Sequence, residues 1–451
     1  MTHIPRIVPR KLACLVAGAL AAMLQAGGAH AISLMQAYDA ALQNDPTFRS
    51  ATHEYDAGQE NRILGRSALL PNISASYSNS KVNADVTYIT DGIATKPREL
   101  EYTSKVATVQ LRQPIINFEG LARYKQGIAQ TDYASAIYQA RKQELIVRVA
   151  AAYTDALFAS TQLRLAEVQR DVYAEQQSVN NRLFEKGEGT KTDMLETQAR
   201  LDLAEAQVLE ARDNVQTARA TLAGIIGQEV VAVDDVTPEF RIAPDAGLRF
   251  DEWREIALKQ NPELAAMQFA IESARQEVNK SRSGHAPRLD FVASYSKNNA
   301  DTLNTYNQDS KQKAIGIQLN IPLYSGGSVN ALTRQTIATQ EKAKSDLQAT
   351  TDKILVELRK QHALVASSVS RIRALDKAVA SGTLLVKATE QSIKGGVRIN
   401  LDLLNAQQQL FTSSRDLAQA RYGYLLGMLK LRAAAGVLDL DSLREVSMYF
   451  R

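Results

Sequence analysis

The chain carries much of its sequence pattern twice. The segment at 41–46 reads ALQNDP, and the similar ALKQNP occupies 257–262. The segment at 187–198 has a counterpart at 396–407, in which glycine, aspartate, leucine and glutamine recur at the same spacing. A unit of about 210 residues used twice indicates duplication rather than a solenoid of short repeats. The sequence therefore predicts two similar halves that build two parts of one structure.

The first 31 residues predict a secretory signal peptide. A basic start at 6–11 precedes an apolar stretch at 12–24, and 29–31 is a small-x-small cleavage site. The single cysteine, Cys14, lies in this segment with most of the apolar stretch after it, which argues against lipid attachment. Cleavage therefore leaves an exported chain that uses neither disulfides nor cysteine metal sites.

The charge of the mature chain is nearly balanced. The signal peptide carries three of the 53 basic residues, namely Arg6, Arg10 and Lys11, which leaves 50 against 49 acidic residues. This balance gives no reason to expect a nucleic-acid partner. After the signal peptide, no apolar stretch reaches the roughly 18 residues of a transmembrane helix. The exported chain is then expected to be soluble, surface-attached or a membrane β-barrel.

Most of the mature sequence predicts amphipathic helices. The segment 119–186 has no proline and is rich in good helix formers, and 328–394 repeats this design. A helix of this length extends roughly 100 Å, which is typical of long helical bundles. Its apolar seam consists of Leu145, Val149, Ala152, Ala156, Ala159 and Leu163. Shorter helical stretches are expected at 33–68, 191–226, 251–284 and 400–435, with a short turn or helix restart at Pro46 and at Pro262.

Four segments alternate apolar and polar residues and predict strands. They are 71–78, 107–111, 291–295 and 315–321, and the polar stretches 80–103 and 298–311 are expected to be the loops that join them in pairs. Ser, Thr, Gln and Asn on one face are too polar for a protein core. The pattern therefore favours a membrane barrel with an aqueous lumen. The lipid-facing candidates are Ile315, Ile317, Leu319, Ala107 and Val109.

Four strands cannot close a barrel, and a lone open sheet has unpaired edges. An oligomer would have to complete the barrel. The alternative is a cap of two hairpins packed on the helices.

The sequence contains no recognisable catalytic constellation. It has no H-E-x-x-H, G-x-x-x-x-G-K-[ST] or G-x-S-x-G motif. Ser283-Gly284-His285 precedes a proline at a predicted helix-to-strand junction, where a turn is the better interpretation than a nucleophile and base. We therefore expect no enzyme, no cofactor and no metal site.

The duplicated turn places Asp193 and Asp402 in the first turn of the helix that follows each break. One interpretation is a helix start stabilised by the helix dipole, worth about 0.3–1 kcal/mol. The other is a ring of acids in a symmetric oligomer, which would select and bind cations at the narrow end of a tube.

The chain resembles the TolC family of outer-membrane channel-tunnel proteins. The resemblance rests on the duplication, on the twin G-x5-D-[ML]-L turns, and on short matching segments at 70–73, 321–327, 405–406 and 421–424. It spans nearly the whole mature chain. It implies a mainly α fold with a membrane β-barrel, built from a duplicated helix–β-hairpin–long helix–helix unit. In a homotrimer, four strands per chain give a 12-stranded barrel. The resemblance places the barrel in the cell outer membrane and an α-helical tunnel in the periplasm.

The resemblance also implies roles at the inner entrance of the tunnel. Asp402 matches the first acid of the constricting ring, whereas the second acid position is Asn405 here. Arg398 matches the basic residue that holds the entrance closed, with Asp193 and Thr192 as its partners on the neighbouring helix pair. The position of the tyrosine that supports this contact in the family holds Ile393, so one hydrogen bond is missing.

The predicted organisation follows the duplication. The segments are the signal peptide 1–31, repeat 1 at 32–227 with its hairpin at about 71–116, a linker at 228–250, repeat 2 at 251–436 with its hairpin at about 288–323, and a C-terminal tail at 437–451.

The resemblance implies a passive exit duct in a tripartite export machine. Its partners would be a periplasmic adaptor (membrane fusion protein), an inner-membrane ABC transporter or proton-driven exporter, and outer-membrane lipid. The absence of a lipid-attachment cysteine favours type I secretion of a polypeptide such as a protease or toxin. The alternatives are multidrug or metal-ion efflux and, in another class, a periplasmic coiled-coil adaptor.

Overall fold

The computed structural model describes residues 31–87, 89–94, 96–237, 240, 249–300, 308–395 and 397–450. The predicted signal peptide, apart from residue 31, lies outside this range, as do Gly396 and most of the C-terminal half of the predicted linker. The chain forms two compact units. Unit 1 contains 1–50, 141–260 and 354–451, and unit 2 contains 51–140 and 261–353. Each unit therefore combines segments from both sequence repeats.

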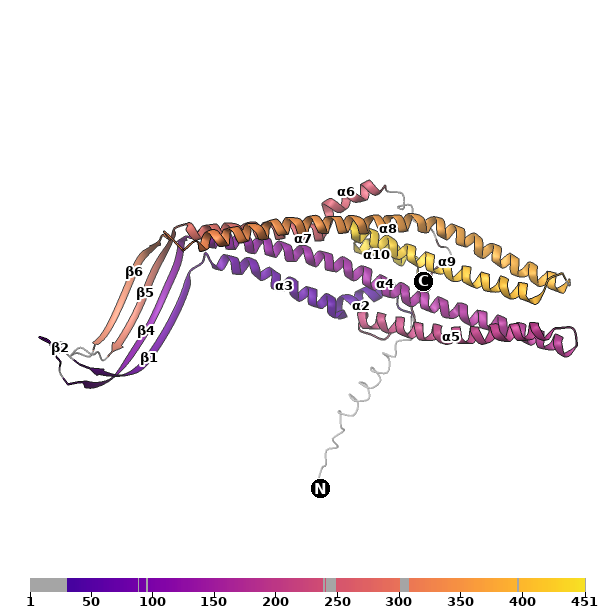
Figure 1. Ribbon diagram of the computed structural model, residues 1–451, viewed down its shortest axis with the longest axis horizontal. Helices are drawn as coiled ribbons and strands as arrows, with labels where there is room; N and C mark the ends of the chain where they lie inside the picture. Colours follow the sequence, from indigo (N-terminus) through magenta and orange to yellow (C-terminus); the bar gives the residue numbers. More distant parts are fainter. Residues whose placement is uncertain are drawn as a thin grey trace, which may run out of the picture. The chain divides into compact units, whose positions relative to one another are not determined.

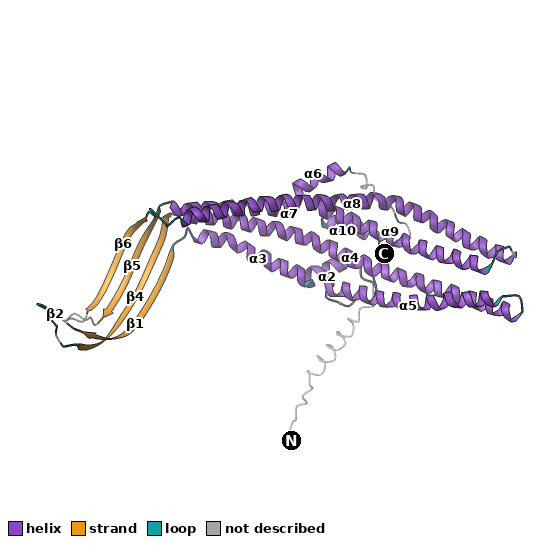
Figure 2. Ribbon diagram, in the orientation of Figure 1, coloured by secondary structure: helices purple, strands orange, loops and turns teal. Residues whose placement is uncertain are grey.

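Helices, a four-stranded antiparallel sheet and a two-stranded antiparallel sheet make up the described structure (Figures 1 and 2). The α-helices are α2 (Leu34–Asn44), α3 (Pro46–Ser67), α4 (Phe118–Glu185), α5 (Lys191–Ile226), α6 (Phe250–Gln260), α7 (Pro262–Arg282), α8 (Ser328–Lys394), α9 (Asn400–Ala435) and α10 (Leu440–Ser447), with a 3-10 turn at Ser283–His285. The strands are β1 (Asn72–Val86), β2 (Ile89–Thr90), β3 (Ile93–Ala94), β4 (Arg98–Ile116), β5 (Arg288–Ala300) and β6 (Gln308–Asn320).

The long helices match the sequence prediction, and the helical stretches expected at 33–68 and 251–284 are each divided at the predicted restarts, Pro46 and Pro262. Asn261 interrupts the second, because its side chain accepts hydrogen bonds from the backbone N–H groups of Glu263 and Leu264, at 2.9 and 3.3 Å. Pro262 then occupies the first turn of α7, where its missing N–H costs nothing. Asp45 starts α3 in a similar way, accepting from the Thr47 N–H at 2.9 Å.

The sheet of unit 2 has the order β1-β4-β5-β6, with every neighbouring pair antiparallel. Its strands are longer than predicted. The stretch 80–103 is largely strand, because β1 continues to Val86 and β4 begins at Arg98, and the described ends of 298–311 belong to β5 and β6. The extension of β1 keeps an alternation, with Val82, Ala84 and Val86 partly buried on one face and Lys81, Asn83 and Asp85 exposed on the other.

Close helix packing in unit 2 depends on glycine. A Cβ atom on Gly127 of α4 would lie 2.3 Å from the backbone oxygen of Asn61 in α3, and one on Gly58 would lie 2.3 Å from Cβ of Ala134. Both distances are too short for any side chain, so α3 and α4 can approach this closely only with glycine at these positions. The rings of Tyr55 and Tyr138 stack between the same helices, with centroids 4.7 Å apart.

The core of unit 1 follows the predicted seam of α4. Leu145, Val149, Ala152, Ala156 and Ala159 are all buried, whereas Leu163 is partly exposed. Buried Tyr153 organises the segments around this seam. Its hydroxyl donates to the backbone oxygen of Ile32 at 3.0 Å and accepts from the N–H of Asp234 at 3.1 Å, and its ring packs edge-on against Phe450. Burial raises the pKa of Tyr153, so the hydroxyl remains a donor.

Among the described residues, no helix combines the length and the apolar character needed to cross a membrane.

Candidate functional site

Two helical turns in unit 1 carry the entrance residues predicted from the sequence. In the turn between α4 and α5, Gly187 has a positive φ of 76° and Thr190 caps α5. The Asp193 N–H donates to the Thr190 hydroxyl at 3.1 Å, and that hydroxyl donates to the Asp193 carboxylate at 2.6 Å. Asp193 thus stabilises the start of α5, as the helix-dipole interpretation requires. Thr192 is exposed beside it.

The turn between α8 and α9 places Arg398 beside Asp402. Their charged groups are 3.9 Å apart, and both side chains are about half exposed. The amide oxygen of Asn405 accepts a hydrogen bond from Arg200 of α5 at 3.1 Å. In the described part of a single chain, Arg398 makes its ion pair with Asp402 and has none with Asp193. A contact of Arg398 with Asp193 and Thr192 therefore stays a prediction for the assembled protein.

A buried polar cluster behind these turns was not predicted from the sequence. Asn180 of α4 donates to the Thr197 hydroxyl at 2.7 Å, and Asn400 of α9 donates to the same oxygen at 3.1 Å. The Thr197 hydroxyl donates in turn to the backbone oxygen of Asp193 at 2.8 Å. Gln176 donates to both Asn180 and Asn400, at 3.2 and 3.0 Å. The cluster ties the start of α9 to the α4–α5 pair.

The sequence did contain a signal for Thr197. The buried residues of α5 begin at Thr197 and continue at Leu201, Ala204, Val208, Ala211 and Val215, so they alternate in steps of four and three. This is the spacing of a coiled-coil seam, in which a polar residue fixes the pairing of helices at a cost in stability. Thr197 is fully buried at such a position, and its hydroxyl has the three hydrogen bonds that burial demands.

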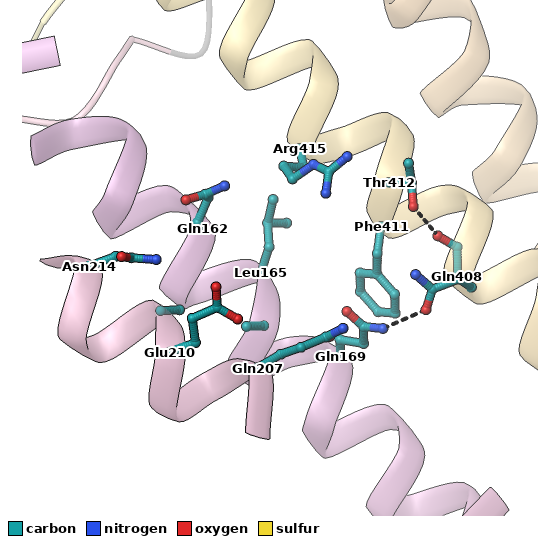
Figure 3. A pocket seen from close by; sticks show the side chains of 12 residues that line it. Gln162, Leu165, Gln169, Gln207, Glu210, Asn214, Gln408, Phe411, Thr412 and Arg415 are labelled. Carbon is teal, nitrogen blue, oxygen red and sulfur yellow. Dashed lines mark hydrogen bonds between the residues drawn. The ribbon is translucent and has the colours of Figure 1, made fainter. Parts of the chain in front are cut away.

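Farther along the same helices, α4, α5 and α9 line an open groove of about 250 Å³ (Figure 3). Its side chains are mostly polar, and Gln169 donates to Gln408 at 2.8 Å on its wall. The Tyr173 hydroxyl donates to the same Gln408 oxygen at 3.2 Å. Burial raises the pKa of Tyr173, which keeps the hydroxyl protonated. The groove offers polar contacts rather than an enclosed ligand cavity.

The register of the sheet places all five lipid-facing candidates on one face. Residues directly opposite in an antiparallel pair share a face, as do alternate residues of a strand. Val109 lies opposite Tyr295, Leu111 opposite Ala293, and Ala293 opposite Ile315. Ala107, Ile317 and Leu319 follow by alternation. The side chains of Ile315, Ile317 and Leu319 are 78%, 68% and 58% exposed in the single chain.

The opposite face of the sheet is polar and carries charge. Asp290 is almost fully buried there, and both Arg112 and Arg288 donate to its carboxylate, at 2.9 and 3.0 Å. Thr108 and Ser296 share a hydrogen bond at 3.2 Å on the same face. Within the predicted strand segments the sheet therefore has one mainly apolar and one mainly polar face, as the alternation predicted, whereas farther along β1 Val82 and Val86 lie on the polar face.

The described residues contain no group of three or more His, Cys, Asp or Glu side chains that could hold a metal ion.

Comparison with known proteins identifies the family. The model of the outer membrane efflux protein family matches residues 37–228 and 253–437. The alkaline protease secretion protein AprF of Pseudomonas aeruginosa is 42% identical over 424 residues, which cover 94% of this chain and 88% of AprF. The proteases secretion protein PrtF of Dickeya chrysanthemi is 35% identical, covering 95% of this chain and 93% of PrtF.

The solved structures agree on the fold. The outer membrane protein VceC from Vibrio cholerae superposes with a TM-score of 0.76 at 17% identity, covering 89% of this chain and 96% of VceC. The fold and the paired turns define a channel-forming class of outer-membrane protein. The chain belongs to the outer membrane efflux protein family, and its location is the outer membrane. Membership of this family excludes the alternative interpretation from the sequence, a periplasmic coiled-coil adaptor.

Proposed function

We propose that this protein is the outer-membrane exit duct of a type I secretion machine that exports a polypeptide such as a protease. The supporting observation is the 42% identity, over nearly the full length, with a protein named for alkaline protease secretion. The two-faced sheet and the buried polar cluster at the helical turns suit a membrane pore with a closable end. A periplasmic adaptor and an inner-membrane ABC transporter would supply docking and energy.

The single-chain sheet supports a homotrimer. Strands β1 and β6 are the two edges of the four-stranded sheet, and β6 exposes Ile315 and Ile317. Edge strands with unpaired backbone groups are not viable in hydrocarbon, so β6 of one chain would pair with β1 of the next until the sheet closes. Three copies give the 12-stranded barrel, with the apolar face toward outer-membrane lipid and the helices in the periplasm.

Complementation tests the proposed function. The chain would be expressed in a Pseudomonas aeruginosa strain that lacks AprF and keeps its other secretion components. We expect alkaline protease activity to return to the culture medium, with the empty vector as the control. Correct outer-membrane assembly without secreted protease would contradict the secretion proposal. The efflux alternative, which the family description favours, predicts restored drug or metal resistance in a strain deleted for its efflux channel.

We propose that Arg398 keeps the inner entrance closed through Asp193 and Thr192 of the neighbouring helix pair. An exposed ion pair is individually weak, about 0–1 kcal/mol, but three copies act together in a trimer. We expect Arg398→Ser to raise single-channel conductance in planar bilayers, because it removes both the closing contact and the cation beside Asp402. Arg398→Lys should keep conductance near the parent value. Unchanged conductance of a correctly assembled Arg398→Ser trimer would disprove this role.

We propose that Asp402 forms the cation-selective constriction, with Asn405 beside it. Three carboxylates near one axis attract a counter-cation, and the neutral Asn405 leaves the ring with half the charge that two acids per chain would give. We expect Asp402→Ala to lower cation selectivity, measured as the reversal potential in a salt gradient, and to abolish weak block by multivalent cations. Asp251→Ala in α6 is the control. A variant as selective as the parent would place the filter elsewhere.

A further inference from the structure

A cluster of lysines borders the apolar face of the sheet. Lys297 of β5 lies directly opposite Lys311 of β6, and Lys313 follows two residues later on the same face. Lys105 of β4 is on this face as well, opposite Asn299. All four side chains are exposed, and none has an ion pair within the described residues. Asp309 is the carboxylate that shares this face near them.

Strand β6 shows how sharply the character of this face changes. Its residues on the apolar face run Lys311, Lys313, Ile315, Ile317, Leu319, whereas the residues between them are small or uncharged polar. Lys313 is about 7 Å along the strand from Ile315, at the usual rise of an antiparallel strand. Tyr295 lies directly opposite Lys313. On the same face, Tyr77 of the edge strand β1 lies directly opposite Ala107 of β4. The apolar band therefore ends in tyrosines and then lysines, toward the hairpin end.

This order has a physical explanation at a membrane surface. Tyrosine prefers the boundary between hydrocarbon and headgroups, and lysine extends its alkyl chain along apolar surface while its ammonium group stays in the polar layer. Like charges placed directly opposite in a sheet are destabilising. Lys297 and Lys311 repel each other unless an anion lies between them. Lys81 and Glu101 on the same face pair with each other, and Glu99 and Asp85 lie farther along β4 and β1, so the four unpaired lysines leave excess positive charge around Lys297 and Lys311, with Asp309 as the nearby carboxylate.

We propose that Lys105, Lys297, Lys311 and Lys313 bind the phosphate groups of lipid headgroups at the membrane surface on the hairpin side of the sheet. This rests on the proposed function, because the apolar face must be toward lipid. Phosphate oxygens would bridge Lys297 and Lys311 and remove their repulsion. The site would recur on each chain, so anionic lipid would surround the outer rim of the barrel.

The purified full-length protein in mild detergent tests the proposal, with diphosphoryl lipid A, phosphatidylcholine and inorganic phosphate as probes. We expect the parent to bind diphosphoryl lipid A at least tenfold more tightly than K297Q/K311Q/K313Q, since each lysine near an anionic surface contributes roughly a fivefold gain. Phosphatidylcholine should not distinguish the two proteins. The charge-keeping variant K297R/K311R/K313R should bind like the parent, as should K353Q/K377Q/K387Q, which removes three exposed lysines of α8.

Equal affinity of the parent and K297Q/K311Q/K313Q for diphosphoryl lipid A would overturn the proposal. Displacement of the lipid by an equal concentration of inorganic phosphate would also overturn it, because the site would then bind free anions. If the glutamine variant does not assemble, the salt dependence of the parent is measured instead. An affinity of the parent for diphosphoryl lipid A that is unchanged between about 50 and about 500 mM salt would contradict a charge-based site. The same parent preparation is also tested for conductance in planar bilayers. A parent that conducts but does not bind the lipid contradicts the lipid site alone, whereas a parent that does not conduct contradicts the proposed duct.

Discussion

Replacing Ile317 with arginine is expected to prevent stable insertion of the protein into the outer membrane. Ile317 lies on the apolar face, 68% exposed in the single chain and directly opposite Phe291. An arginine that faces lipid near the bilayer midplane costs roughly 2–4 kcal/mol, and a trimer carries that cost three times. We expect the variant to lose most of its heat-resistant, detergent-extractable trimer, measured by unheated gel electrophoresis of outer-membrane fractions.

The matched control is the neighbouring residue on the opposite face. Gln318 lies opposite Asp290, on the polar side of the sheet, at nearly the same height as Ile317. Gln318→Arg should assemble almost as well as the parent, because its charge would point to water rather than to lipid. Equal assembly of the Ile317 and Gln318 variants would show that the apolar face is not toward lipid.

The helical part of the fold was predictable because its breaks are encoded locally. The segment 186–190 carries two glycines and a capping threonine, and α5 begins at the predicted residue. The helix restarts at Pro46 and Pro262 were also predicted, because an asparagine or aspartate before a proline is a strong start signal. The strands were predicted too short. The distal part of β6 has polar side chains on both faces, and in β1 the apolar residues change face, from Ile73 and Tyr77 to Val82 and Val86, so no single alternation runs through the strand.

The two turns proposed as the entrance were identified from the sequence, but the contacts around them were not. The repeated turn identified Asp193 and Asp402, whereas the hydrogen bonds around Thr197 depend on how α4, α5 and α9 pack, which no local pattern specifies. Arg398 precedes α9, which begins at Asn400, so its pairing with Asp402 depends on the conformation of the turn rather than on helical spacing. The contact proposed for Arg398 with Asp193 and Thr192 would form in the assembled protein, so no local sequence pattern specifies it.

Replacing Thr197 with valine is expected to loosen the inner entrance of the tunnel. The two side chains have nearly the same shape, so the variant removes the hydroxyl without creating a cavity. Asn180 and Asn400 would each keep a buried N–H that no longer has this acceptor, which costs about 1–3 kcal/mol per group. The start of α9 would then separate from the α4–α5 pair more readily. We expect a several-fold rise in mean single-channel conductance, with longer open periods, in planar bilayers.

Thr221→Val is the matched control, because Thr221 lies on the same helix α5, is exposed and donates only to the backbone oxygen of Thr217, at 2.9 Å. It should leave conductance at the parent value. A further comparison uses Thr197→Ser, which keeps the hydroxyl and should remain closed. If Thr197→Val assembles as a trimer and conducts like the parent, the buried cluster stabilises the helices without controlling the entrance. The closed state would then depend on contacts between chains, such as those proposed for Arg398.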